Sequence, residues 1–526
     1  MTMQHSLTPL QFPRHQHPIQ HLIHASRYQF QQTLAKQSTT LGQAVEEYIS
    51  RTGMHPPPHF DVWYEFARSK NVQLIDEYDA ITHLLKPFWG IPPAIIRTNA
   101  RLVFSAEQNE FPGIVIRNGK IGRTEGLAPR EETYVNSIRE MMDSFAQYLP
   151  DMDLVINPKH EPSIIKSQDA LARYVRDAGK VRRPQVPRNH FSPTPADLLE
   201  GIPLHAGSNV FETNAQTAWS SMTQSCPITS PARDPDGSDN LAAYSYENFI
   251  YNTTASVDVC NQPSLSHHHG FFNRPTTLLY SSSLPPVFSV SKISSFNDIL
   301  MPPPDVYSQG RSVENGTDID WEDKIDQLFW RGESPTDSSI VQRIVTENKE
   351  PVPILKNVNS HWIKDTVPAA EIQALFDIKF TTALDDTEGV ISTESAVVAE
   401  EIWKSKYVLN LDGPGQSIPG LYTLLKSKSL VFKASIFQAW HDEFLWPWVH
   451  YIPLGLDGGD WFENLRYFAT EESGKSEGKM IAKESAEWAS KVLRKEDMEV
   501  CMFRLLLEYV HQFWGFTDVQ VRKSNR

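Results

Sequence analysis

The sequence predicts an α/β protein with a parallel β-sheet, and the stretch from residue 406 to residue 454 carries most of this prediction. Three short apolar runs in it are typical of buried strands: 407–409, 429–432 and 448–454. A glycine- and proline-broken loop, 412–417, follows the first run, and leucines at helical spacing precede the second. This alternation is that of a parallel sheet, whose ligands bind outside the carboxyl ends of the strands. The loop is therefore a candidate phosphate site, although an ordinary turn is its more frequent meaning.

The composition is that of a globular protein of two or three domains. The 526 residues are 40% apolar and 21% charged, and the formal net charge is −15. An acidic chain without an evident basic face argues against a nucleic-acid partner and fits a small-molecule or glycan substrate better.

The compartment is not decided by the sequence pattern itself. Of three cysteines, Cys226 and Cys260 are the closer pair and can form one disulfide, while Cys501 is left over. No run approaches the roughly 18 apolar residues of a membrane span, and the amino-terminal stretch lacks the apolar core of a signal peptide.

Further elements are predicted along the chain from spacing and composition. Residues 1 to about 25 are rich in His, Gln and Pro and are expected to be disordered. Long loops are expected over 203–285, with the triplet His267-His268-His269 exposed rather than metal-bound. Helical spacing predicts helices at 27–50, 133–148, 321–329, 461–468, 477–494 and 496–514, and short strands are predicted at 154–156 and 287–292.

Polar residues follow the predicted strand 154–156, where a catalytic group is well placed in an α/β domain. Among them is His160, with Glu161 beside it. A neutral imidazole can accept a proton near pH 7, and a neighbouring carboxylate raises its basicity. Taken alone, however, such a pair is more often simply solvated.

Four runs in order along the chain resemble glycosyltransferase family 90, which includes fungal capsule-associated xylosyltransferases and animal protein O-glucosyltransferases. The runs are LPDMDLVIN at 149–157, FSVSKISSFNDILMP at 288–302, WRGESPT at 330–336 and the strand-rich stretch 406–454. The resemblance implies a GT-B fold, in which two Rossmann-like domains face each other and carboxyl-terminal helices pack back. The implied division is a tail and stem helix (1–50), an acceptor-side domain (51–290), a nucleotide-sugar domain (291–465) and terminal helices (466–526).

The resemblance implies an inverting transfer of xylose or glucose from a UDP-sugar to a hydroxyl of a glycan or glycoprotein, in the lumen of the Golgi or endoplasmic reticulum. His160 and Glu161 are the candidate catalytic residues. Arg331 can neutralise a diphosphate. The candidate donor-binding residues are Arg331, Ser334, Thr336, Asp412, Gly413, Gly415, Ser417 and Lys433. No metal cofactor is expected, although Asp151-Met152-Asp153 and Asp234-Pro235-Asp236 imitate metal-binding DxD motifs.

Three positions depart from the family pattern. His160 stands where an aspartate base is usual, Ser334 stands where a second basic residue is often seen, and Gly420 stands where an arginine usually meets the donor phosphates. The changes at His160 and Gly420 favour an alternative, a family member that has lost turnover and acts as a glycan- or nucleotide-binding protein. A third, weaker hypothesis is an unrelated α/β scaffold that binds protein partners.

Overall fold

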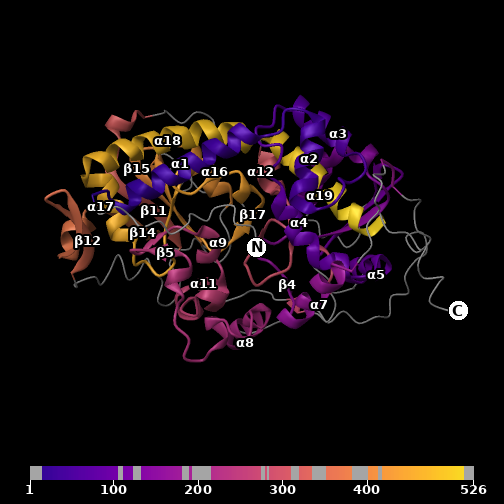
Figure 1. The fold of residues 1–526 in the computed structure, drawn as a ribbon, viewed down its shortest axis with the longest axis horizontal. Helices are drawn as coiled ribbons and strands as arrows, with labels where there is room; N and C mark the ends of the chain where they lie inside the picture. Colours follow the sequence, from indigo (N-terminus) through magenta and orange to yellow (C-terminus); the bar gives the residue numbers. More distant parts are fainter. Residues whose placement is uncertain are drawn as a thin grey trace.

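Two five-stranded sheets organise the protein (Figure 1). The computed structural model describes residues 15–104, 111–122, 132–180, 189–191, 215–273, 279–280, 284–309, 319–333, 351–381, 401–412 and 418–514. Within this part of the chain, none of the helices combines the length and apolar content needed to cross a bilayer.

The first sheet is mixed and has the strand order β10-β8-β3-β1-β2. Strands β10, β8 and β3 pair parallel with one another, whereas β1 pairs antiparallel with both β3 and β2. Their bounds are β1 (Gly113–Arg117), β2 (Lys120–Ile121), β3 (Met152–Ile156), β8 (Val287–Ser289) and β10 (Ile299–Leu300). The strand predicted at 154–156 is confirmed. The sheet reaches Leu300, past the domain boundary predicted at residue 290.

The second sheet is entirely parallel, with the order β14-β11-β15-β16-β18. Its strands are β11 (Ile325–Glu333), β14 (Phe376–Thr381), β15 (Ser405–Leu411), β16 (Leu430–Ala434) and β18 (Ile452–Pro453). Because the chain winds outward in both directions from β11 and β15, a topological switch point lies between these two strands. Ligands of doubly wound sheets bind at such a point, outside the carboxyl ends of the strands.

The second sheet confirms some strand predictions and overturns one helix. Strands lie at 407–409 and 429–432 as predicted, but of the run 448–454 only Ile452–Pro453 is a strand. The helix predicted at 321–329 is wrong, because Ile325–Glu333 is strand β11. Backbone pairing with β14 on one side and β15 on the other outweighs the helical spacing of its apolar residues.

The prediction of disorder over residues 1 to about 25 is wrong for 18–25, because they belong to helix α1 (Pro18–Lys36), while 1–14 lie outside the described residues. His17 caps it, since its Nδ1 accepts from the amide of Ile19. The buried His17 ring also stacks on Tyr467, with ring centres 4.3 Å apart, and its Nε2 lies 3.0 Å from Glu463. The polar composition of this segment predicts disorder, but contacts of the capping His17 with Tyr467 and Glu463, which are distant in the sequence, stabilise the start of the helix. A second helix, α2 (Leu41–Thr52), follows after a break at the Thr40 capping box.

Residues 215–273 form short helices where long loops were predicted. The helices are α8 (Ala215–Met222), α9 (Thr253–Ser256), α10 (Leu265–His268) and α11 (Gly270–Asn273). A disulfide joins Cys226 to Cys260 across this region, as the sequence suggested, and Cys501 is free and buried.

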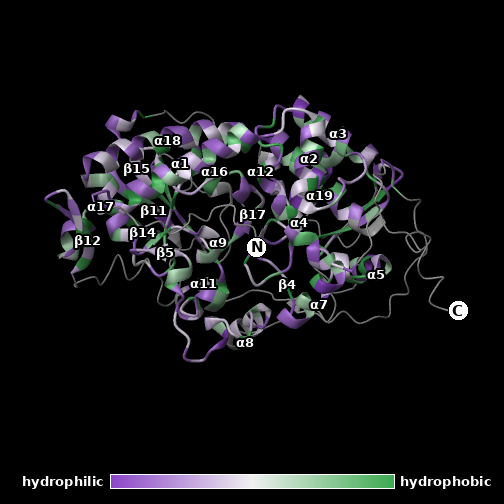
Figure 2. Ribbon diagram, in the orientation of Figure 1, coloured by the Kyte–Doolittle hydropathy of each residue, from purple (hydrophilic) through white to green (hydrophobic). Residues whose placement is uncertain are grey.

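The carboxyl-terminal helices pack back across the protein as expected. Helix α18 (Glu472–Val492) follows α17 (Trp461–Thr470) and lies beside α1, where Arg27 pairs with Glu477 and Glu484 (Figure 1). Helix α19 (Lys495–Trp514) packs instead on the half that contains the first sheet, with Phe503 stacked on Phe145. Figure 2 shows hydrophobic residues gathered on β11 and β15 and hydrophilic residues along much of α18.

Shorter elements complete the described fold. The remaining helices are α3 (Phe60–Ser69), α4 (Asp79–Leu85), α5 (Pro93–Phe104), α6 (Glu132–Asp143), α7 (Gln168–Ala178), α12 (Pro304–Gln309), α14 (Ala369–Gln373) and α16 (Ile418–Lys426). The remaining strands are β4 (Ile164–Ile165), β5 (Ser245–Tyr246), β6 (Phe249–Ile250), β7 (Leu279–Tyr280), β9 (Ser291–Lys292), β12 (Val352–Val358), β13 (His361–Val367) and β17 (Gln438–Ala439).

Helix α19 is anchored by a buried arginine inside an aromatic cage. The guanidinium carbon of Arg504 lies 4.6 to 5.5 Å from four ring centres, and its Nε donates to Glu508 at 2.9 Å. Glu508 also accepts from the hydroxyl of Tyr48. The four rings are those of Tyr48, Phe60, Trp63 and Tyr78. The cage thus fixes α19 on α2, α3 and the residue before α4.

Replacing Arg504 with Met should destabilise the protein by about 3–5 kcal/mol, because Glu508 is left as a buried and uncompensated charge. Chemical unfolding of both proteins measures this difference. Lys475→Met is the matched control, since it breaks an exposed ion pair with Glu472 and should cost less than about 1 kcal/mol. Equal effects of the two substitutions would contradict the anchoring role of the cage.

Candidate functional site

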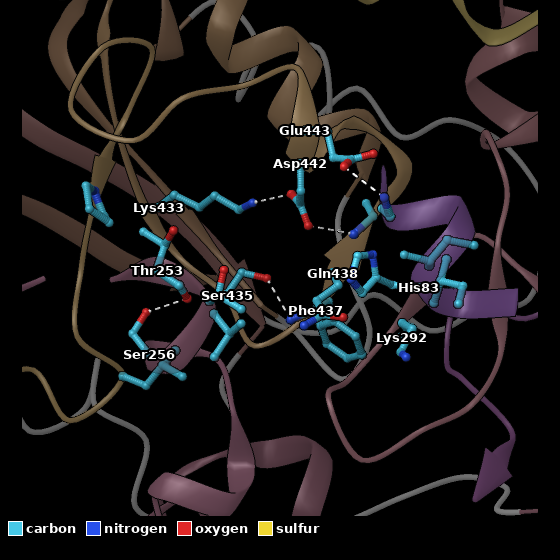
Figure 3. Close-up of a pocket in the computed structure, with 18 of the residues that line it drawn as sticks. His83, Thr253, Ser256, Lys292, Lys433, Ser435, Phe437, Gln438, Asp442 and Glu443 are labelled. Carbon is cyan, nitrogen blue, oxygen red and sulfur yellow. Dashed lines mark hydrogen bonds and ion pairs between the residues drawn. The ribbon is translucent and has the colours of Figure 1, made fainter. Parts of the chain in front are cut away.

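A cavity of about 310 Å³ is lined by residues from both halves of the protein (Figure 3). From the first half come His83 of α4, Lys292 of β9 and Leu300 of β10. From the second half come residues at the carboxyl ends of β16 and β18 and the turn between them: Lys433, Ser435, Phe437, Asp442, Tyr451 and Leu454. The cavity therefore lies where the strand ends of the two sheets approach each other.

A two-stranded ribbon in the cavity wall joins the two halves. Strands β9 and β17 pair antiparallel, with Lys292 opposite Gln438 and Ser291 opposite Ala439. Both Lys292 and Gln438 line the cavity. Because β9 follows directly on β8 of the first sheet and β17 follows β16 of the second, the ribbon sets the distance between the sheets.

Lys433, a predicted donor-binding residue, lies in the cavity wall and forms an ion pair there. Its Nζ lies 3.3 Å from Oδ1 of Asp442 and 5.3 Å from the ring centre of Tyr451. Burial by itself lowers the pKa of Lys433, but the Asp442 carboxylate raises it above the ordinary value. Burial likewise raises the pKa of Asp442, yet Lys433 holds it below normal. Both groups are therefore charged at neutral pH.

Asp412, a second predicted donor-binding residue, ties together the ends of two neighbouring strands. It follows β15, and its Oδ2 accepts from the amide of Ile436, just after β16, at 2.8 Å. The same oxygen lies 3.4 Å from Nε2 of His269. The prediction that the histidine triplet is exposed is wrong for His269, because Asp412 and the Phe272 ring hold it in place.

Arg331 lies near the carboxyl end of β11, on one side of the switch point, but it does not line the cavity. One terminal nitrogen donates to the main-chain carbonyl of Asp377 at 2.7 Å and the other to its carboxylate at 2.8 Å, while the Glu401 carboxylate lies 3.7 Å away. The guanidinium also lies 4.3 Å from the Phe329 ring centre. Its charge is thus balanced by protein carboxylates.

Several predicted positions are not among the residues that the structure describes. These are Ser334, Thr336, Gly413, Gly415 and Ser417. Gly420, where the sequence resemblance leads us to expect an arginine, is the third residue of α16.

The loop that carries His160 is held by a buried polar network. The Asn157 amide, just after β3, donates to Glu161 O at 2.7 Å and to the hydroxyls of Ser163 and Ser289. The fully buried Asp298 accepts from the amides of Ser163 and Ile164 and from the Ser289 hydroxyl. Ser289 and Asp298 belong to the run 288–302 that resembles the family, but the sequence predicted no role for either residue.

The His160 side chain itself is 44% exposed, and its Nε2 lies 3.9 Å from Oδ2 of Asp305 on α12. Its carbonyl oxygen accepts from the hydroxyl of Ser291. Since Ser291 precedes Lys292 in β9, His160 is linked through one hydrogen bond to the strand that lines the cavity. Glu161, its predicted companion, is buried.

The two aspartates of the first DxD-like motif, Asp151 and Asp153, have other partners. Asp153 pairs with Arg101 and Arg117, each at 2.7 Å, and Asp151 accepts from the amide of Asn118. Among the described residues, no group of three or more His, Cys, Asp or Glu side chains is placed to hold a metal ion.

Comparison with known proteins finds a family that part of the chain resembles. Residues 273–524 match the model of Glycosyl transferase family 90, so this part of the chain is similar to that family. Over 250 residues the chain is 27% identical to Protein O-glucosyltransferase 2 of Danio rerio. This aligned region covers 45% of this chain and 44% of the relative. The chain thus spans less than half the length of that relative. Lys292, Arg331, Asp412 and Lys433 lie inside the region matched to the family, whereas His160 lies outside it.

Replacing Asp298 with Ala should loosen the His160 loop and destabilise the protein by about 2–5 kcal/mol, because three buried donors lose their acceptor. Hydrogen exchange should accelerate at the amides of Ser163 and Ile164, and chemical unfolding measures the loss of stability. Asp236→Ala removes the same charge from an exposed residue and should change neither quantity. Unchanged exchange at both amides would mean that Asp298 does not hold this loop.

Proposed function

We propose that the protein is an inverting glycosyltransferase of the GT-B type, which transfers xylose or glucose from a UDP-sugar to a hydroxyl of a glycan or glycoprotein. One observation carries this proposal. The segment that matches the family contains the whole parallel sheet with its switch point, and it supplies Lys292 and Lys433 to the cavity wall and Asp412 directly after β15. Strand ends at a switch point are where nucleotide ligands bind in doubly wound sheets.

In the proposed reaction, His160 takes the proton of the acceptor hydroxyl while that oxygen attacks the anomeric carbon in line. A new bond forms to the anomeric carbon as its bond to the UDP oxygen breaks, so the configuration inverts. Asp305, 3.9 Å from the imidazole, would stabilise the positive charge that His160 acquires.

The donor diphosphate is proposed to lie at the switch point between β11 and β15. The loops that follow these strands would supply backbone amides and the hydroxyls of Ser334, Thr336 and Ser417. Arg331 and Lys433 would add positive charge, and in the case of Arg331 the diphosphate would compete with Asp377. Transfer by these groups requires no metal cofactor.

The disulfide supports a lumenal location for this activity. A bond between Cys226 and Cys260 persists in oxidising compartments such as the endoplasmic reticulum and the secretory pathway. We therefore propose the endomembrane lumen, where glycan and glycoprotein acceptors are also present.

The test of this function is release of UDP from UDP-xylose and from UDP-glucose, with UDP binding measured in parallel by calorimetry. We expect UDP to bind and one of the two sugars to turn over when glycan or glycoprotein acceptors are added. Binding without release would favour the alternative, a family member that binds nucleotide but has lost turnover. No binding of UDP would contradict both and point to the unrelated scaffold.

His160→Ala should lower the transfer rate on the order of 10²- to 10⁴-fold, since the acceptor hydroxyl loses its general base, while UDP affinity stays unchanged. Initial rates at saturating donor and calorimetry separate the two effects. His361→Ala, an exposed histidine on β13, is the matched control and should transfer normally. Normal rates for His160→Ala together with loss of transfer in Glu161→Gln would identify Glu161 as the base instead.

A further inference from the structure

Lys292 is a buried lysine in the cavity wall, and its ammonium group forms no hydrogen bond within the part of the chain that the structure describes. Lys292 is only 8% exposed and lines the cavity. Its Nζ makes neither a hydrogen bond nor an ion pair with any other residue that the structure describes. In Figure 3, dashed lines join Lys433 to Asp442, whereas none reaches Lys292.

Two other lysines with little exposed surface, Lys324 and Lys433, have close partners. Lys324 is 4% exposed, and its Nζ donates to Trp403 O, Ser427 O and the Ser429 hydroxyl at 2.7 to 3.1 Å. Lys433, across the same cavity, has Asp442. A buried ammonium without such partners costs folding free energy, so Lys292 is unusual within its own fold.

The Asp298 carboxylate attracts the Lys292 ammonium without forming a hydrogen bond or an ion pair with it. The two oxygens of Asp298 instead accept three hydrogen bonds that hold the His160 loop. Burial lowers the pKa of Lys292 to about 8, and the Asp298 charge only partly opposes this. Lys292 is therefore still protonated at neutral pH, and its N–H donors face the cavity without a protein acceptor among the described residues.

We propose that Lys292 receives an anionic group of a substrate in this cavity, either a phosphate oxygen or a carboxylate. A phosphate would come from the donor diphosphate, and a carboxylate would come from a uronic acid in an acceptor glycan. The inference rests on the proposed function for the identity of these substrates, but anion binding can be measured without turnover. In a water-poor wall an unpaired ammonium attracts an anion more strongly than it would in solvent.

Calorimetry with UDP, uridine and glucuronic acid on Lys292→Met tests the proposal. Loss of one charge-assisted contact should weaken binding of the responsible anion at least tenfold and leave uridine unaffected. Weaker UDP with unchanged glucuronic acid identifies the diphosphate, and the reverse identifies the carboxylate. The matched control is Lys483→Met, which removes a lysine whose side chain is 75% exposed and should change no affinity.

Thermal unfolding distinguishes a binding role from a structural one. Because the substitution removes a buried and unpaired charge, Lys292→Met should unfold at the same temperature as the unsubstituted protein or higher. A lower unfolding temperature would show that Lys292 holds the fold and would overturn the proposal. Unchanged affinity for both anions in Lys292→Met, or no binding of either anion to the unsubstituted protein, would also overturn it.

A second variant keeps the test independent of folding. Affinity for the anion should fall several-fold as pH rises from 7 to 9, because Lys292 loses its proton near pH 8, whereas Lys292→Arg should keep its affinity at pH 9. The other charged or titratable groups in the wall are His83, Lys433, Asp442, Glu443 and Tyr451, and both proteins retain them. An identical pH dependence in the two proteins would therefore exclude Lys292. Anion binding through Lys292 without UDP release would overturn the transferase while leaving this inference standing.

Discussion

Two backbone pairs between β9 and β17 are the constraint on which the arrangement of the site depends. They join a strand that continues the first sheet to one that continues the second, and they place Lys292 and Gln438 in the same cavity wall. The Ser291 hydroxyl extends this link to the His160 carbonyl. His160, which belongs to the half with the first sheet, is thus held near the strand ends of the second sheet, because the paired strands of the ribbon restrict movement between the halves.

The distribution of buried charge separates structural from functional positions. Arg504 with Glu508, Asp153 with two arginines, and Lys324 with three acceptors are compensated where they are buried. Their cost of desolvation is offset by hydrogen bonds within the fold. Lys292 differs because it has no hydrogen-bond acceptor among the described residues, while Asp298, which attracts it, accepts the hydrogen bonds of the His160 loop. The ammonium of Lys292 can therefore donate to a ligand in the cavity.

Sequence patterns succeeded where one element buries its own apolar run. Strands β3, β15 and β16, the helices after residue 461, and the Cys226–Cys260 pair were all predicted. The patterns failed where a distant partner decides the conformation. Strand β11 carries helical spacing but is paired on both edges, and α1 begins at a cap whose ring rests on Tyr467.

The sequence by itself determined the α/β class and indicated the candidate loop that begins at Asp412, because strand ends and glycine-broken loops are local signals. His160 and Lys433 were candidates through the family resemblance, and their roles stay predictions. Only the tertiary structure decided which of these residues share a site. It paired Arg331 with Asp377 and His269 with Asp412, and it set Lys433 across one cavity from Lys292. Charge compensation depends on which groups approach within a few ångströms, and spacing along the chain carries no information about such contacts.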